Sequence, residues 1–150
     1  MAIVDIPKSP AELSPEWLTG ALQSGGATDA RIASFDYEPI AAGVGFLGKL
    51  GRLRLHYAGN GKGLPRTLIV KQPTLDAKSR QLAMMFRFYE REVSFYRDIG
   101  SAAGIHIPTM HFGAADPKSG DFVLLMEDLA PARVGDQLAG CSAEDARSAV

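Results

Sequence analysis

Apolar and polar side chains alternate along residues 50–57, which predicts a β-strand with one buried face. The alternation runs through the apolar Leu53, Leu55 and Tyr57 and the polar Arg52, Arg54 and His56. Residues 59–63 read Gly-Asn-Gly-Lys-Gly, a composition typical of turns, and residues 67–72 form the next apolar run. We therefore expect these two strands to pair as an antiparallel hairpin.

A helical period follows the third strand and predicts one long helix over residues 77–99. Six apolar or aromatic residues fall on one face: Leu82, Met85, Phe86, Tyr89, Val93 and Tyr96. Phe88, Phe95 and Ile99 form a flanking arc, and the helix is expected to end near Gly100 and Gly104.

The remaining pattern predicts another helix near each end of the chain and three further strands. Ser14 and Pro15 are typical of a helix start, and Gly25-Gly26 of its end. Strands are expected at 32–39, 108–115 and 121–129, and Ser142 is expected to cap a last helix. The fold class expected is α+β: a five-stranded antiparallel sheet with one long helix, preceded by an N-terminal helix.

We expect three segments along the chain. Residues 1–29 form an N-terminal helical extension, residues 30–129 the folded lobe, and residues 130–150 a linker with the start of a following part. Because the sequence stops just after a helix has been capped, we expect it to be a fragment of a longer chain.

The composition and charge of the chain argue against several classes of function. A hydrophobic content of 46% with 22% charged residues is typical of a globular chain, and a formal net charge of −1 argues against nucleic acid as a partner. We find no signal peptide and no apolar run long enough for a membrane span, so we expect a cytoplasmic protein without membrane contact. Cys141 is the single cysteine, and the histidines lack metal-ligand spacing, so we expect no metal site in this chain.

Glycines at Gly43, Gly45 and Gly48 match the pattern G-x-G-x-x-G. Most of the Walker pattern is also present, with Lys49 as its lysine, but Leu50 stands where a hydroxyl residue would bind magnesium. Walker and dinucleotide loops both open a helix, whereas the alternation that follows here predicts a strand. A glycine loop between two antiparallel strands is the protein-kinase arrangement, and a plain hairpin turn is the alternative.

A lysine and a glutamate are expected to form an ion pair. Lys71 ends the apolar run 68–70, and Glu92 falls between apolar groups on the predicted helix. A carboxylate on an apolar face is costly unless a cation is close, and Lys71 is the cation available. Glu90 falls on the helix edge and is expected to be a solvated surface charge.

These motifs together resemble the superfamily of aminoglycoside phosphotransferases, choline and ethanolamine kinases, and ecdysteroid-kinase-like phosphotransferases. The resemblance covers about residues 30–150. It is carried by the glycine-rich segment 43–48, by Leu68-Ile69-Val70-Lys71, by the helix stretch 89–96 and by Leu124-Leu125-Met126-Glu127-Asp128-Leu129.

The resemblance implies the small lobe of a kinase-like fold that binds ATP. The implied nucleotide-binding residues are Gly43, Gly45, Phe46, Gly48, Lys71, Glu92, Glu127 and Leu129. Lys71 would contact the α- and β-phosphates, Glu92 would orient it, and the backbone of Glu127 and Leu129 would bind adenine. The family's His-Gly-Asp loop and its Mg²⁺ ligands do not occur in the sequence, so no catalytic or metal-binding residue is expected before Val150.

The function expected of the full protein is transfer of the ATP γ-phosphate to a hydroxyl of a small substrate, an aminoglycoside or choline-like alcohol. The fragment would be inactive alone, and its partners would be ATP, that acceptor and its own large lobe. The alternative is a nucleotide-binding or interaction module without catalysis.

Overall fold

The computed structural model describes residues 5–40, 47–132 and 138–148 and has an α+β fold built on a five-stranded antiparallel sheet. The strands are β1 (Ile32–Ile40), β2 (Gly48–Tyr57), β3 (Thr67–Pro73), β4 (Met110–Asp116) and β5 (Asp121–Glu127). Their order across the sheet is β1-β2-β3-β5-β4, and every neighbouring pair is antiparallel. The predicted hairpin of β2 and β3 is confirmed.

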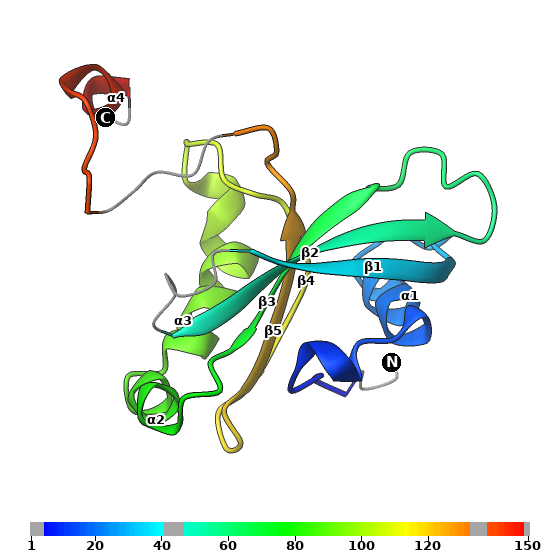
Figure 1. Ribbon diagram of the computed structural model, residues 1–150, viewed down its shortest axis with the longest axis horizontal. Helices are drawn as coiled ribbons and strands as arrows, with labels where there is room; N and C mark the ends of the chain where they lie inside the picture. The colour runs from blue at the N-terminus through cyan, green and yellow to red at the C-terminus, as the bar shows by residue number, and fades with distance from the viewer. Residues whose placement is uncertain (1–4, 41–46, 133–137, 149–150) are drawn as a thin grey trace.

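Helical elements flank the sheet (Figure 1). The α-helices are α1 (Pro15–Ser24), α2 (Ala77–Met85), α3 (Phe88–Ser94) and α4 (Ala143–Ser148). The π-helical segment η2 (Phe95–Ile99) and the short 3₁₀ helices η1 (Pro10–Glu12) and η3 (Gly100–Ala102) complete the described elements. The side chain of Ser14 accepts a hydrogen bond from the Trp17 N–H, as its position before Pro15 predicts for an N-cap.

Two apolar clusters lie on opposite faces of the sheet. On one face, α1 packs with Leu18, Ala21 and Leu22 against alternate residues of β2, β3 and β5. On the other, Tyr89 and Val93 of α3 pack against Phe122, Leu124 and Met126 of β5. Figure 1 shows α1 on one side of the sheet and α2 and α3 on the other. Strand β5 is buried along nearly its whole length because both clusters cover it.

The single long helix predicted over 77–99 is wrong. Arg87 has the left-handed angles φ 55° and ψ 37°, which end α2 and separate it from α3. The apolar face is divided accordingly: Tyr89 and Val93 are buried, whereas Met85 and Phe86 are 67% and 51% exposed. The break turns α2 so that Ala83 is buried instead.

In this orientation of α2, Arg80 forms an ion pair with Asp121. Its guanidinium donates to the buried Asp121 at the start of β5, at 2.6 Å. α2 therefore contacts the start of β5 through Arg80, while α3 packs against β5 through Tyr89 and Val93.

Within the described ranges, no helix combines the length and the hydropathy that crossing a membrane requires.

Candidate functional site

The Lys71 and Glu92 side chains form the predicted ion pair. Lys71 lies near the end of β3, and its Nζ is 2.5 Å from Oε1 of Glu92 on α3. Alternation along β3 directs Val70 into the α1 side of the core and places Lys71 on the opposite face, toward α3. The two side chains are 26% and 28% exposed, so water screens the pair and its contribution to stability is modest. The ammonium remains open to a further anionic partner.

Glu90 was expected to be a solvated charge, and this is wrong. Its side chain is only 17% exposed and accepts a hydrogen bond from Nε of Arg87 at 3.0 Å. Arg87 lies three positions before Glu90, a spacing at which side chains on a helix meet. Glu90 therefore has a local partner, and Glu92 is the carboxylate that faces β3.

Gly48 packs directly against the lysine stem. A Cβ atom at Gly48 would lie 3.1 Å from Cε of Lys71 and 3.1 Å from the carbonyl oxygen of Gln72, which is tighter than ordinary packing. A glycine at this position therefore lets β2 approach the lysine closely. The other predicted loop residues, Gly43, Gly45 and Phe46, lie outside the described residues.

The residues that follow the glycine-rich segment form a strand and not a helix. β2 begins at Gly48 and pairs antiparallel with both β1 and β3. Walker and dinucleotide loops require a helix at this point, so those two interpretations are wrong for this chain.

An apolar platform adjoins the lysine on the same face of the sheet. Ile69 precedes Lys71 by two positions, Leu50 is the cross-strand partner of Lys71, and Met126 is the partner of Ile69. Directly paired residues project from the same side of a sheet. Leu50 and Ile69 are only half-buried, so part of this apolar surface is open. The sequence analysis did not predict that Leu50 and Ile69 form a common surface, although the alternation of β2 and β3 contains the signal.

The two residues expected to bind adenine, Glu127 and Leu129, lie at the end of β5 and just after it. The N–H of Glu127 donates to the Thr109 carbonyl at 2.8 Å, and the Glu127 carboxylate accepts from the Thr109 N–H and hydroxyl, each at 3.0 Å. The backbone N–H of Glu127 is therefore already engaged. Leu129 is 38% exposed, and its N–H has no hydrogen-bond partner in the part of the chain that is described.

Asp128 anchors this segment, a role that the sequence analysis missed. Its carboxylate is 5% exposed and accepts from Nε of Arg52 on β2 at 2.7 Å. Burial by itself raises the pKa of the Asp128 carboxyl, but hydrogen bonds from Arg52, the Ala130 N–H and Thr67 outweigh burial and hold that pKa below its usual value. The segment carrying Leu129 is thus tied to β2.

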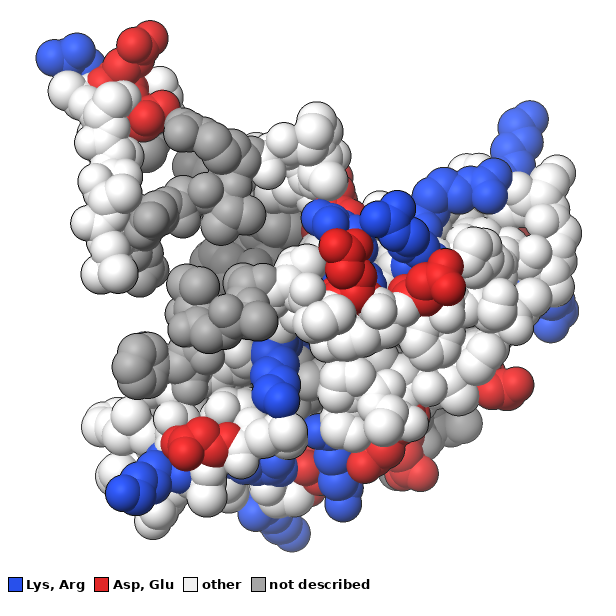
Figure 2. All heavy atoms as spheres, in the orientation of Figure 1, with Lys and Arg blue, Asp and Glu red and all other residues white. Residues whose placement is uncertain are grey.

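Charges of both signs lie together around this anchor. Glu38 of β1 pairs with Arg52 at 3.8 Å and with Arg54 at 3.3 Å. Figure 2 shows lysine and arginine side chains beside aspartate and glutamate side chains on the visible face. The described residues on that face therefore form a mixed rather than a broadly basic surface.

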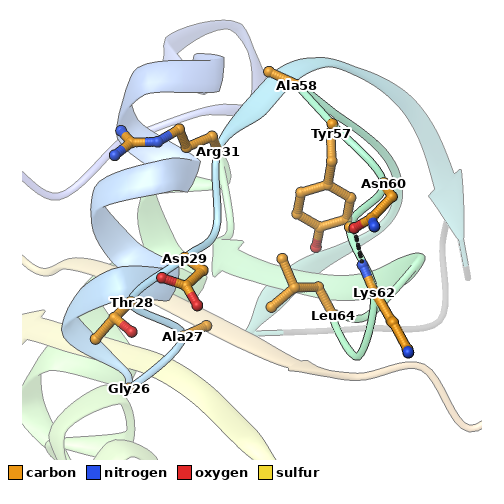
Figure 3. Close-up of a pocket in the computed structure, with 12 residues that line it drawn as sticks. Gly26, Ala27, Thr28, Asp29, Arg31, Tyr57, Ala58, Asn60, Lys62 and Leu64 are labelled. Carbon is orange, nitrogen blue, oxygen red and sulfur yellow. Dashed lines mark hydrogen bonds between the residues drawn. The ribbon is translucent and has the colours of Figure 1, made fainter.

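A hollow of about 400 Å³ lies away from Lys71 and Glu92 (Figure 3). It is lined by the turn between α1 and β1, including Asp29, and by the turn between β2 and β3, including Asn60 and Lys62. The Asn60 side chain there accepts a hydrogen bond from the Lys62 N–H at 3.0 Å, which stabilises the turn itself. The hollow contains none of the predicted site residues, so we place the candidate site by the paired charges instead.

The described residues contain no group of three or more histidine, cysteine, aspartate or glutamate side chains placed to hold a metal ion. Comparison of the chain with models of protein families, with curated proteins and with solved structures found no match. The functional interpretation therefore rests on three features: a partly exposed ammonium paired with a helix glutamate, an apolar platform next to it, and a Leu129 N–H that has no partner among the described residues.

Proposed function

We propose that this chain is the ATP-binding small lobe of a kinase-like phosphotransferase that acts on a hydroxyl of a small molecule. The observation that carries the proposal is the ion pair between Lys71 of β3 and Glu92 of the helical segment that follows. In protein kinases a glycine-rich loop covers the ATP phosphates, and a lysine on the third strand pairs with a glutamate of the next helix. The order of glycine-rich segment, strand lysine and helix glutamate is the same here.

The site is suited to a nucleotide in three respects. The Lys71 ammonium can bind the α- and β-phosphates while Glu92 holds it in place. The open apolar surface of Leu50 and Ile69 provides a flat contact for adenine, and the Leu129 N–H provides a donor for its edge. Because Gly48 has no side chain, the start of β2 packs closely against the lysine stem and supports it from one side.

This chain would bind and orient the nucleotide, and the rest of the reaction would need groups from elsewhere. Mg²⁺ would neutralise charge on the phosphates when bound. The described residues show no cluster of ligands for it, so we assign it no position. We propose that a large lobe supplies the base, the metal ligands and the acceptor site, and that the chain alone transfers no phosphate.

Calorimetric titration with MgATP tests the proposal through two lysines. Lys71→Ala should weaken ATP binding by at least about tenfold, because a charge-assisted hydrogen bond to the phosphates is lost. Lys49→Ala is the matched control: Lys49 is exposed and pairs with Gln72 across β2 and β3, so its ammonium projects from the other face. Binding through a Walker-type loop would require Lys49 instead.

The expected result is loss of affinity in Lys71→Ala, no change in Lys49→Ala, and similar thermal unfolding of both variants. A parent chain that binds no ATP would overturn the proposal. Equal affinity in Lys71→Ala and the parent would also overturn it.

A further inference from the structure

We infer that Tyr89 is a positioning residue that holds the start of β2 against Lys71, and this inference rests on the proposed function. Tyr89 lies on α3 one turn before Glu92. Its hydroxyl donates a hydrogen bond of 2.7 Å to the carbonyl oxygen of Leu47, directly before Gly48.

Three contacts link α3, the start of β2 and Lys71 in a closed circuit. Tyr89 of α3 binds Leu47, Gly48 packs against the Lys71 stem, and the Lys71 ammonium binds Glu92, which returns to α3. Any movement of the β2 start away from α3 would therefore free the lysine stem on the side of Gly48. The ion pair would then hold the ammonium from one side only.

The aromatic ring and the hydroxyl group of Tyr89 make separate contacts. The ring stacks on Phe122 of β5, with centroids 4.7 Å apart and an interplanar angle of 15°, and the residue is 3% exposed. This stacking belongs to the core and would remain in phenylalanine. Burial also raises the pKa of the Tyr89 phenol, so the hydroxyl stays a donor at neutral pH. Tyr89→Phe therefore removes the hydroxyl's contacts, with the Leu47 carbonyl and with the Thr74 backbone, while it keeps the packing.

Tyr57 provides a matched control. Its hydroxyl also donates 2.7 Å to a backbone carbonyl, that of Pro65, and burial likewise raises its pKa. Tyr57 lies at the far end of β2 from Gly48. Tyr57→Phe thus removes the same kind of hydrogen bond at a place remote from Lys71.

The experiment measures the affinities of the chain for MgATP and for adenosine, together with thermal unfolding, in the parent, Tyr89→Phe and Tyr57→Phe. Tyr89→Phe should weaken ATP binding roughly fivefold, the value of one typical hydrogen bond, and should leave adenosine binding unchanged because adenosine has no phosphates for Lys71. Tyr57→Phe should lower the unfolding midpoint comparably and change neither affinity. In a Lys71→Ala background, Tyr89→Phe should have no further effect on ATP.

The outcomes separate this inference from the proposed function. If Lys71→Ala weakens ATP binding and Tyr89→Phe does not, the inference is overturned and the proposed function stands. Equal losses for ATP and adenosine in Tyr89→Phe would overturn it as well, since they would indicate general loosening of the core. A parent chain that binds neither nucleotide would overturn the proposed function and the inference together.

Discussion

Asp128 shows at the scale of one residue how a buried charge positions the segment that carries Leu129. A carboxylate that is 5% exposed needs partners, and Arg52 and the Ala130 N–H provide them. The same contacts fix the backbone on either side of Leu129, the residue whose N–H is unpaired within the described ranges. Local stability and the proposed adenine contact therefore depend on one side chain.

Asp128→Asn should lower the free energy of unfolding by about 1–3 kcal/mol at neutral pH, because the amide retains the shape but loses the charge that faces Arg52. The pKa of Asp128 is lowered in the folded chain, so its contribution is fully present above the ordinary aspartate pKa of about 3.9. It is lost as the pH falls through the folded pKa. Urea unfolding from pH 7 to pH 3 should show the difference between variant and parent shrinking below about pH 4.

Asp98→Asn is the control for this pH dependence. Asp98 also pairs with an arginine, Arg97, but its side chain is 53% exposed, so the change should be small at every pH. A destabilisation by Asp128→Asn that stays constant down to pH 3 would contradict the assignment of the effect to the charge.

At the scale of elements, the break between α2 and α3 decides which carboxylate reaches β3. Arg87 has a left-handed backbone, although neither glycine nor proline marks the position. After the break, α3 is oriented by burial of Tyr89 and Val93, and Glu92 faces Lys71. Because of the same break, Met85 and Phe86 at the end of α2 are exposed.

The relative stabilities of two variants at Arg87 test whether the helix is broken there. Arg87→Gly and Arg87→Ala both lose the ion pair with Glu90, but only glycine adopts the left-handed conformation freely. The glycine variant should be more stable by about 1 kcal/mol in urea unfolding. In an unbroken helix alanine would be favoured by about 1 kcal/mol instead.

Arg91, exposed within α3, supplies the comparison. There Arg91→Ala should be more stable than Arg91→Gly, because the backbone is helical. The same order at both positions would contradict a break at Arg87.

At the scale of the whole molecule, α1 and the sheet share one core. Leu18 is fully buried in the cluster that includes residues of β2, β3 and β5. Trp17, the single tryptophan, meets Phe112 of β4 edge-on with centroids 5.6 Å apart. The helix and the sheet are therefore expected to unfold as one unit.

Tryptophan fluorescence and far-ultraviolet circular dichroism should report the same midpoint in urea, because the first signal arises in α1 and the second in all elements. Leu18→Ala should shift both midpoints and cost about 2–5 kcal/mol. Leu75→Ala, at a position that is 63% exposed, should change little. A fluorescence transition that precedes the dichroism transition would show that α1 unfolds independently.

Much of this structure follows from local patterns in the sequence. Strand β2 was predictable because its alternate residues face core and solvent, and α1 because Ser14 and Pro15 begin a helix. The pairing of Lys71 with Glu92 was predictable as well, since a carboxylate among apolar residues requires a cation. In each case the physical cause acts within a few residues or is the need of one buried carboxylate for a cation.

The sequence by itself determined the α+β class, the strands, the glycine segment's place between two of them and the lysine–glutamate pair. Only the tertiary structure decided the helix break at Arg87, because the contact of Arg80 with Asp121 and the packing of Ala83, Tyr89 and Val93 in one cluster outweigh the continuous helical period. It also decided the Asp128–Arg52 anchor and the Tyr89–Leu47 contact, whose partners are 76 and 42 residues apart. Such contacts form when strand order brings distant segments together, and no local period encodes them.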